Sequence, residues 1–264
     1  MNAMLCLNQV SCNVGGAKLL EATTAAIAAG QVTAILGPNG AGKSTLLALL
    51  SGQRRASSGR VWLNGTLLDD MSPAATARVR ALLHQDSSVA FDYTVRELVE
   101  LGRYPHRLQP SAHEAGIVQA AMAATGVLHL QHRVVTALSG GERARAQLAR
   151  VLAQLWEPTA SGEPRCLLMD EPTAALDMAH QHQVLALAKD WAVRQGVGAV
   201  LVLHDLNLAL RYADHVLLLQ KGRLTHQGPP REVLTPAVVA EVWGVQAQAV
   251  AHADGVGQLL VSAA

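Results

Sequence analysis

Nine consecutive residues have types and spacing suited to holding a chain of phosphates. They are Gly37-Pro38-Asn39-Gly40-Ala41-Gly42-Lys43-Ser44-Thr45, and they fit the pattern G-x-x-x-x-G-K-[ST]. Glycines let the backbone curl so that successive N–H groups point at phosphate oxygens. Lys43 supplies a mobile positive charge for the β- and γ-phosphates, and the Ser44 hydroxyl is placed to hold Mg²⁺. The segment therefore predicts a phosphate loop.

The flanking residues place this loop between a strand and a helix. The β-branched run Val32–Leu36 predicts a strand, and Leu46–Leu50 predicts a helix that stops at Gly52. A helix N-terminus carries partial positive charge, which adds to the attraction for an anion at the same point. The alternative, a glycine-rich turn that happens to precede a lysine, does not account for both flanking elements.

Polar side chains also follow two further apolar runs. Cys166–Met169 ends in Asp170-Glu171, and Ala199–Leu203 ends in His204. Such runs are typical of strands buried on both faces of a parallel sheet, and open α/β sheets bind ligands along the carboxyl edge. We expect Asp170 to anchor Mg²⁺, Glu171 to orient and polarise a water, and His204 to donate a hydrogen bond to the γ-phosphate.

Gln85 follows a third short apolar run, Ala81–Leu83, and its amide can reach the metal or the water. Taken alone, Asp170-Glu171 could be a solvated acidic pair and His204 an ordinary strand-end histidine. Their occurrence together, downstream of the phosphate loop, favours one site for hydrolysis of a γ-phosphate.

A second glycine-rich turn, Leu138-Ser139-Gly140-Gly141-Glu142, precedes a predicted helix over Arg143–Leu155. A helix N-terminus of this kind is a second anion site, unless the turn is merely a loop with an N-cap. One chain does not need two such sites for one γ-phosphate. The simplest solution is a head-to-tail dimer with two-fold symmetry, in which each ATP lies between the phosphate loop of one copy and Ser139-Gly140-Gly141 of the other.

Composition narrows the class of protein. The chain has 264 residues, half of them hydrophobic and 3% aromatic, so aliphatic side chains must fill the core. The net charge of +1 argues against a general nucleic-acid-binding surface. The three cysteines form no C-x-x-C pair, which predicts buried thiols in a reducing compartment. We identify no signal peptide, and no apolar run is long enough to span a membrane.

The remaining pattern predicts the elements that position these residues. Residues 4–36 are expected to form short strands and turns, and Asn64-Gly65 to join a hairpin after Val61–Leu63. A helix is expected over Pro73–Arg80, with Ser72 as its N-cap. From Asp86 the pattern becomes helical, with capping boxes at Thr94–Glu97 and Ser111–Glu114, the second opening a helix that Gly126 ends. Glu157–Arg165 is predicted to be a surface loop, and residues 228–264 have no clear pattern.

Taken in order, these motifs resemble those of the nucleotide-binding subunits of ABC transporters. The matching residues are the phosphate loop, Gln85, Leu138–Glu142, Asp170-Glu171, Ala175-Leu176-Asp177 and His204. The resemblance implies an α/β fold with a phosphate-loop ATPase (RecA-like) core, an antiparallel β subdomain and an inserted helical subdomain. Residues 1–86 and 160–264 would form the core and β subdomain, and residues 87–159 the helical subdomain. It also implies that Asp177 acts across the dimer interface.

Partners follow from the same resemblance. The ATPase would drive two copies of a transmembrane permease at the cytoplasmic face of the bacterial inner membrane, with Gln85 coupling the ATP site to the groove that receives a permease helix. A periplasmic substrate-binding protein would take part indirectly. A soluble ABC ATPase of DNA repair or translation is a distant alternative, because such proteins usually carry long additions. A phosphate-loop kinase or GTPase would have no use for Leu138–Glu142.

A narrower resemblance comes from Phe91–Val95 and Leu101–His106, which are similar to segments of the importers of haem, ferric siderophores and vitamin B12. Within that group, the sequence around Ala90-Phe91 and Trp156–Pro158 is most similar to the corresponding sequence of the haem-import ATP-binding subunits. A ferric siderophore or vitamin B12 remains an alternative cargo. Phe91 and Tyr93 are expected to serve either permease docking or the core.

Two further expectations concern adenine and the histidines. ABC ATPases usually place an aromatic residue before the phosphate loop to stack on adenine, and Val14 stands at that point here. Because base–aromatic stacking is worth about 1–3 kcal/mol, we predict weaker nucleotide affinity or looser base selectivity. His180 and His182 point to different helix faces, and His129 and His132 have no third ligand beside them. We therefore expect no metal or haem site on this chain.

Overall fold

The computed structural model describes residues 3–85, 92–174, 176–251 and 255–263. Within them, the main sheet has six strands in the order β10-β9-β3-β8-β7-β6. The strands from β9 to β6 run parallel, and β10 pairs antiparallel with β9. Their bounds are β3 Val32–Leu36, β6 Arg80–Leu83, β7 Cys166–Asp170, β8 Gly198–Val202, β9 His215–Gln220 and β10 Arg223–Gly228. The parallel order brings the carboxyl ends of β3, β8, β7 and β6 to one edge.

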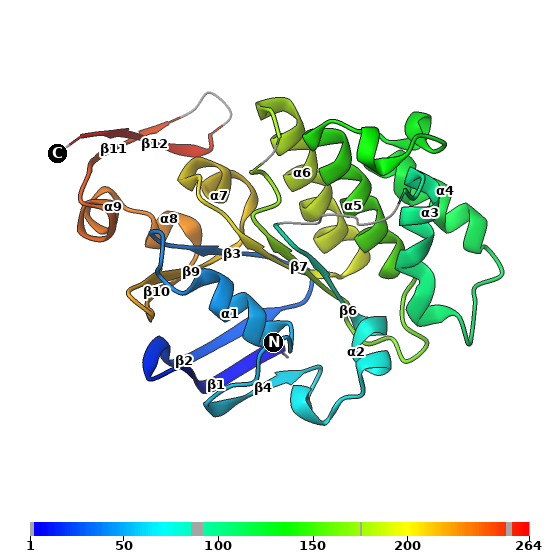
Figure 1. The fold of residues 1–264 in the computed structure, drawn as a ribbon. Coiled ribbons are helices and arrows are strands. Elements are labelled where there is room, and N and C mark those ends of the chain that lie inside the picture. Colours follow the sequence, from blue (N-terminus) through cyan, green and yellow to red (C-terminus); the bar gives the residue numbers. More distant parts are fainter. Residues whose placement is uncertain (1–2, 86–91, 175, 252–254, 264) are drawn as a thin grey trace.

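A second, antiparallel sheet of four described strands, β2-β1-β4-β5, lies beside the first (Figure 1). It contains β1 Ala3–Val14, β2 Ala17–Ala28, β4 Ser58–Leu63 and β5 Thr66–Leu67. The predicted hairpin turn at Asn64-Gly65 is confirmed, since both residues have positive φ between the paired strands β4 and β5. The prediction of short strands was wrong, because β1 and β2 have 12 residues each and pair along their length with several register shifts.

Helices cover both faces of the main sheet (Figure 1). Helix α1, Lys43–Leu50, packs with one face of β3 and with the antiparallel sheet, where Ile35, Leu46 and Leu50 are fully buried. Helices α6, Met178–Gln195, and α7, Leu206–Tyr212, contribute to the cluster on the other face. Burial of both faces explains why the central strands are continuously apolar. The predicted helix after Ser72 is confirmed as α2, Pro73–Val79, with the Ser72 hydroxyl accepting from the Ala75 N–H.

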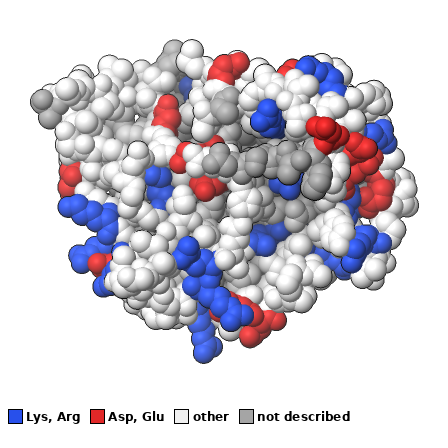
Figure 2. Space-filling view, in the orientation of Figure 1, with Lys and Arg blue, Asp and Glu red and all other residues white. Residues whose placement is uncertain are grey.

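The segment after Asp92 is mostly helical and has a hydrophobic cluster of its own. Its elements are α3 Val95–Glu100, η2 Leu101–His106, α4 Glu114–Ala124, η3 Leu128–Leu130, η4 Val135–Ala137 and α5 Gly140–Gln154. The capping box at Thr94–Glu97 is confirmed, with both reciprocal hydrogen bonds present. Helix α4 ends just before Gly126, as the sequence predicts. On the face in Figure 2, acidic side chains gather at the right, where α3 and α4 lie, and charges of both signs are interspersed elsewhere.

The second predicted capping box forms only in part: the Ser111 N–H donates to the Glu114 carboxylate at 2.8 Å, but no side chain caps the first turn of the helix. Helix α4 begins at Glu114 with His113 as its N-cap and without a side-chain cap hydrogen bond. The Ser111 hydroxyl instead donates to Glu157, at 2.7 Å, and the Glu114 carboxylate accepts a two-pronged contact from Arg103. Arg103, a buried cation, draws both carboxylates toward itself, and this tertiary interaction overrides the local capping pattern.

The last part of the chain, left unassigned by its sequence, folds into α8 Pro230–Val233, α9 Pro236–Trp243 and a hairpin of β11 Gln246–Ala251 with β12 Gly257–Ser262. The predicted loop before β7 is confirmed, although its last residue, Arg165, is buried. Among the described residues, no helix combines the length and the apolar character needed to cross a bilayer. A short 3-10 helix, η1 Leu68–Asp70, follows β5 directly.

Candidate functional site

The phosphate loop runs from the end of β3 into α1 and is packed tightly against its surroundings. Gly37 has φ 145°, and a Cβ atom there would lie 2.1 Å from the Leu219 carbonyl oxygen. Gly42, the N-cap of α1, has φ 101°. These two positions require glycine, because L-residues avoid such backbone angles and because the β9 backbone leaves no room at Gly37.

Lys43 is the buried cation of this loop, with 6% of its surface exposed. Its Nζ donates to the carbonyl oxygens of Gly37, at 2.9 Å, and Pro38, at 3.0 Å. Burial lowers the pKa of Lys43, while the negative charges of Glu171 and Asp170 act in the opposite direction. The ammonium group is therefore held by neutral carbonyls in a place where additional negative charge would stabilise it.

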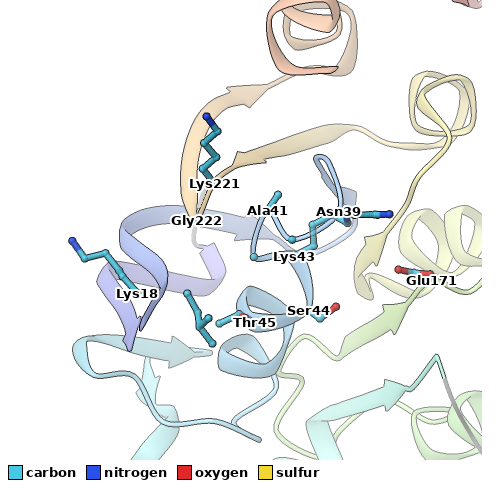
Figure 3. A pocket seen from close by; sticks show the side chains of 12 residues that line it. Lys18, Asn39, Ala41, Lys43, Ser44, Thr45, Glu171, Lys221 and Gly222 are labelled. Carbon is cyan, nitrogen blue, oxygen red and sulfur yellow. The ribbon is translucent and has the colours of Figure 1, made fainter. Parts of the chain in front are cut away.

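A cavity of about 600 Å³ opens over the loop. It is lined by residues 39–45 of the loop, by Lys18 and Leu19 of β2, by Glu171, and by the turn Lys221-Gly222 between β9 and β10. Figure 3 shows the side chains of Lys18 and Lys221 on the opposite side of the loop from Glu171. The turn is attached to the loop, since the Gly222 N–H donates to the Ala41 carbonyl oxygen at 3.0 Å. The cavity is thus bounded by cations at one end and by a carboxylate at the other.

Glu171 lies between two polar side chains from neighbouring strand ends. Gln85 donates its amide N–H to Oε2 of Glu171 at 2.7 Å, and Nε2 of His204 lies 2.6 Å from Oε1. Since the carboxylate accepts, the ring nitrogen donates. Glu171 has φ 49°, a left-handed conformation that is costly for a residue with a side chain, and Pro172 disfavours the right-handed helical alternative. This backbone turn lets the carboxylate face back toward the sheet edge.

Asp170, the last residue of β7, is half-buried, and its Oδ1 atom is buried without a hydrogen-bond partner. Burial raises the pKa of Asp170, the Glu171 charge raises it further, and His84, Lys43 and His204 oppose that shift. His84 itself contacts Gln53 at 3.1 Å. The carboxylate therefore has an unused acceptor beside the loop, where a cation would stabilise its charged form.

The turn Ser139-Gly140-Gly141 and Asp177 are not brought to this cavity within one chain. Ser139 is the N-cap of α5, and its reciprocal hydrogen bonds with Glu142 form a capping box. Asp177, whose side chain is 67% exposed, caps α6 and contacts the His180 ring at 2.8 Å. The hydrogen bond from the His180 backbone N–H lowers the pKa of Asp177, and the His180 side chain adds to the effect. Neither the turn nor Asp177 lines the cavity over the chain's own phosphate loop.

Comparison with known proteins identifies the arrangement. The family model described as ABC transporter matches residues 20–174, more than half of the chain. The chain belongs to the ABC transporter family. Its predicted enzyme class, an ATPase, and its fold of phosphate-loop core, antiparallel sheet and helical segment are confirmed by this membership.

Relatives of this ABC transporter chain include proteins named Hemin import ATP-binding protein HmuV. That of Myxococcus xanthus is 51% identical over 88% of this chain and 86% of its own length. That of Methylobacillus flagellatus is 44% identical over 92% of this chain and 90% of its own. Among solved structures, an ABC transporter of metal-chelate type in an inward-facing conformation matches with a TM-score of 0.81 and 27% identity, covering 99% of this chain and 98% of that one.

Several contacts of the ABC transporter chain give no signal in its sequence. Lys18, Leu19 and Lys221 line the cavity over the phosphate loop although no motif contains them, because only the fold brings β2 and the β9–β10 turn beside the loop. Val14, at the position where the family usually has an aromatic residue, is 44% exposed and is not among the lining residues. Phe91 and Ala175 lie outside the described residues.

Proposed function

We propose that this ABC transporter chain hydrolyses ATP to power import of haem through a membrane permease. The observation that carries the catalytic part is the Glu171 carboxylate, fixed between Gln85 and His204 at the edge of the sheet that bears the phosphate loop. The cargo is proposed from relatives named for hemin import that match most of the chain. A ferric siderophore or vitamin B12 is the alternative cargo, and a soluble ABC ATPase the distant one.

The phosphate loop would bind the triphosphate of ATP through residues 37–45. Its backbone N–H groups and the N-terminus of α1 attract phosphate oxygens, and Lys43 exchanges the carbonyl oxygens of Gly37 and Pro38 for those of the β- and γ-phosphates. Because burial lowers the pKa of Lys43, added phosphate charge is expected to hold it in the ammonium form. On binding, the Lys43 ammonium would thereby exchange neutral carbonyl partners for negatively charged phosphate oxygens.

Hydrolysis would depend on Glu171 as the group that orients a water and accepts its proton. Gln85 and His204 hold one carboxylate oxygen each, which fixes the carboxylate at the end of the cavity. When the γ-phosphate is present, His204 can turn its donated hydrogen bond to the oxygen on which charge develops. Gln85 then remains to keep Glu171 aligned with the water.

A magnesium ion fits the donors at this edge. Asp170 offers a buried oxygen without a partner, and the Ser44 hydroxyl and Gln85 amide oxygen are the other proposed ligands. The described residues contain no cluster of three or more His, Cys, Asp or Glu that could hold a metal. The oxygens of Asp170, Ser44 and Gln85 suit Mg²⁺, because this ion keeps several waters and takes further oxygens from substrate phosphates. When bound, Mg²⁺ neutralises charge that develops on the phosphates.

The complete site would need two copies of the chain. Ser139-Gly140-Gly141 and Asp177 lie outside the chain's own cavity, and the N-terminus of the 15-residue helix α5 faces outward. A head-to-tail pair with two-fold symmetry would place these groups over the phosphate loop of the other copy. Each ATP would then be enclosed by both subunits.

The remaining partners follow from the transport role. Two copies of a permease would receive the dimer at the cytoplasmic face of the bacterial inner membrane, and a periplasmic binding protein would deliver the cargo. Gln85 would link the ATP site to the docking groove between the core, residues 1–86 and 160–264, and the helical subdomain, residues 87–159. Tyr93, at the start of the helical part, is proposed to contact the permease. Nucleic acid is not expected to bind.

The catalytic assignment is tested with Glu171→Gln in the purified chain. The amide cannot accept the proton, so ATP should still bind, dimers should accumulate and hydrolysis should fall by about 10²–10⁴-fold. Turnover at the wild-type rate would refute the role of Glu171. Binding of ATP is measured separately, so that a folding defect is not mistaken for a catalytic one.

The shared site is tested by mixing a Lys43→Ala chain with a Ser139→Ala chain. In a mixed pair, one site contains both substitutions and the other contains neither. With random pairing, half of the dimers are mixed and have one of two sites intact, so about a quarter of the wild-type activity should return. No recovery, with both variants folded and paired, would exclude the two-copy site.

The cargo is tested in vesicles that contain the permease and the ATPase. Binding protein loaded with hemin, with a ferric siderophore or with vitamin B12 is added, and ATP hydrolysis and uptake are measured. Stimulation by hemin-loaded protein is expected. Stimulation by either of the other two alone would replace haem as the cargo without changing the ATPase assignment.

A further inference from the structure

His204 stands in a short segment between strand β8 and helix α7. Its side chain is 46% exposed, and its Nε2 atom lies 2.6 Å from the Glu171 carboxylate. The segment is held at the sheet end by the Leu203 N–H, which donates to the Ile35 carbonyl oxygen at 3.1 Å. At its other end it runs directly into the first turn of α7. The position of His204 therefore depends on how firmly that turn is held.

The first turn of α7 is capped and then attached to a distant part of the chain. Asp205 accepts hydrogen bonds from the backbone N–H groups of Asn207, at 2.7 Å, and Leu208, at 3.0 Å. The Asn207 amide donates to the Leu259 carbonyl oxygen at 3.1 Å, and its Oδ1 accepts from the Leu259 N–H at 2.8 Å. One side chain thus satisfies both backbone groups of a strand residue 52 positions away.

Leu259 belongs to β12 of the C-terminal hairpin and is 4% exposed in the main hydrophobic cluster. Most other described residues of the hairpin are exposed or half-buried, including Leu260 at 60% and Val261 at 52%. The hairpin therefore adds little to the core of the protein. Its buried contact is concentrated at the one residue that pairs with Asn207.

We propose that the C-terminal hairpin β11–β12, through the paired amide of Asn207, positions His204 for ATP hydrolysis. This inference rests on the proposed role of His204. Helix α7 has only seven residues, and isolated helices of this length are not stable in water. The hairpin supplies a fixed point behind its first turn, and Asn207 is a positioning residue that does not contact the substrate.

Loss of this fixed point should affect turnover and spare nucleotide binding. The phosphate loop is held by β3, α1 and the β9–β10 turn, none of which depends on Asn207. Small misplacement of a catalytic group reduces rates strongly, by up to about 100-fold for a shift of 1 Å. For Asn207→Ala we expect kcat to fall by about 10-fold while the KM for ATP changes less than about twofold.

The test compares Asn207→Ala with Asn64→Ala in the full chain. Asn64 serves as the control, since its side chain also donates to a distant backbone carbonyl, that of Pro164, at 2.9 Å. Because Asn64 has φ 51°, alanine there also adds backbone strain, so kcat is compared per folded molecule. In Asn207→Asp a carboxylate oxygen replaces the donor and faces the Leu259 carbonyl oxygen, so a loss of kcat at least as large as that of Asn207→Ala is expected, and this variant carries the test if Asn207→Ala does not fold. An equal loss of kcat in Asn64→Ala and Asn207→Ala would overturn the proposal.

A second comparison separates positioning from general weakening. In a His204→Ala background, Asn207→Ala should cause no further loss of kcat, because the group that it positions is absent. Full additivity of the two losses would overturn the proposal. If His204→Ala itself hydrolyses ATP at the wild-type rate, the role assigned to His204 fails first, and that outcome is distinguishable because it does not involve Asn207.

Discussion

Arg103 is expected to be the cation on which the helical part of this chain depends most. It is 7% exposed and makes four hydrogen bonds that join three segments. Nε and Nη2 donate to the two oxygens of Glu114 at 2.7 and 2.9 Å, Nη2 also donates to Glu157 at 3.2 Å, and Nη1 donates to the Ala153 carbonyl oxygen at 2.8 Å. The guanidinium thus fastens η2 to the start of α4 and the end of α5.

The magnitude follows from which groups would be left without partners. Removing one member of a fully buried ion pair costs about 3–5 kcal/mol. Here the carboxylates of Glu114 and Glu157 are 31% and 39% exposed, so water can reach them once Arg103 is gone. We therefore expect Arg103→Ala to lower the free energy of unfolding by about 2–3 kcal/mol. For a chain of this size that corresponds to a fall in Tm of roughly 5–10 °C.

Arg96 provides the matched control. It forms an ion pair with Glu100 of 3.0 Å, but the two side chains are 41% and 48% exposed. Such a pair is worth about 0.3–0.5 kcal/mol, so Arg96→Ala should be nearly neutral. Arg103→Lys keeps the charge and loses the planar fork, and should fall between the two. Stability is measured by chemical denaturation, and ATP hydrolysis per folded molecule should be unchanged in all three variants.

The pH dependence of the free energy of unfolding gives a second test of the interaction between Arg103 and Glu114. The hydrogen bonds from Arg103 are the main cause that lowers the pKa of Glu114 from 4.5. A depressed carboxylate pKa stabilises the fold at pH values above 4.5, and this contribution is lost as the pH falls through the lower pKa of the folded state. In Arg103→Ala that acid-dependent loss should shrink. A variant as stable as Arg96→Ala, with the pH dependence of the wild type, would refute the reasoning.

Three further predictions concern the close approach of η2 to α5, the carboxylate of Asp170 and adenine stacking at position 14. Gly102→Ala would place a Cβ 2.1 Å from the Arg150 carbonyl oxygen, forcing η2 away from α5, so thermal unfolding should show a loss of about 1–3 kcal/mol. Burial raises the pKa of Asp170, so Asp170→Asn should make the ligand-free fold more stable near pH 7, a gain that shrinks as the pH falls, while hydrolysis is lost. Val14→Tyr should tighten ATP binding, measured by titration, and unchanged affinity would count against adenine stacking at that position.

The sequence predicted the parts of the fold that depend on local pattern. The strand, loop and helix around Lys43, the turn at Asn64-Gly65 and the cap at Thr94 follow from glycine conformation, β-branching and capping, and the structure contains them. The apolar runs before Asp170 and His204 predicted buried parallel strands, because only a strand covered on both faces is apolar throughout. The order of the strands in the sheet has no such local signal.

Other features depend on groups that are distant in the chain. The Ser111 box is incomplete because the Ser111 hydroxyl donates to Glu157, 46 residues away, and the Glu114 carboxylate is shared between the Ser111 N–H and Arg103. The left-handed backbone of Glu171 has no signature in residue type, since glycine would ordinarily be expected there. The pairing of Asn207 with Leu259 joins a helix to a hairpin that has no clear sequence pattern. Each of these features is determined by tertiary contacts, and the local sequence either favours another conformation or gives no signal.

The geometry around Glu171 links these observations to the order of events at the site. Without a γ-phosphate, His204 and Gln85 donate hydrogen bonds to the Glu171 carboxylate. Lys43 donates to carbonyl oxygens of its own loop. Each functional group therefore has a partner that a phosphate or a water can replace without leaving a buried charge uncompensated. Asp170 differs, because its buried oxygen has no partner. A cation bound together with the nucleotide would satisfy that oxygen, so metal and nucleotide are each expected to increase the affinity of the site for the other.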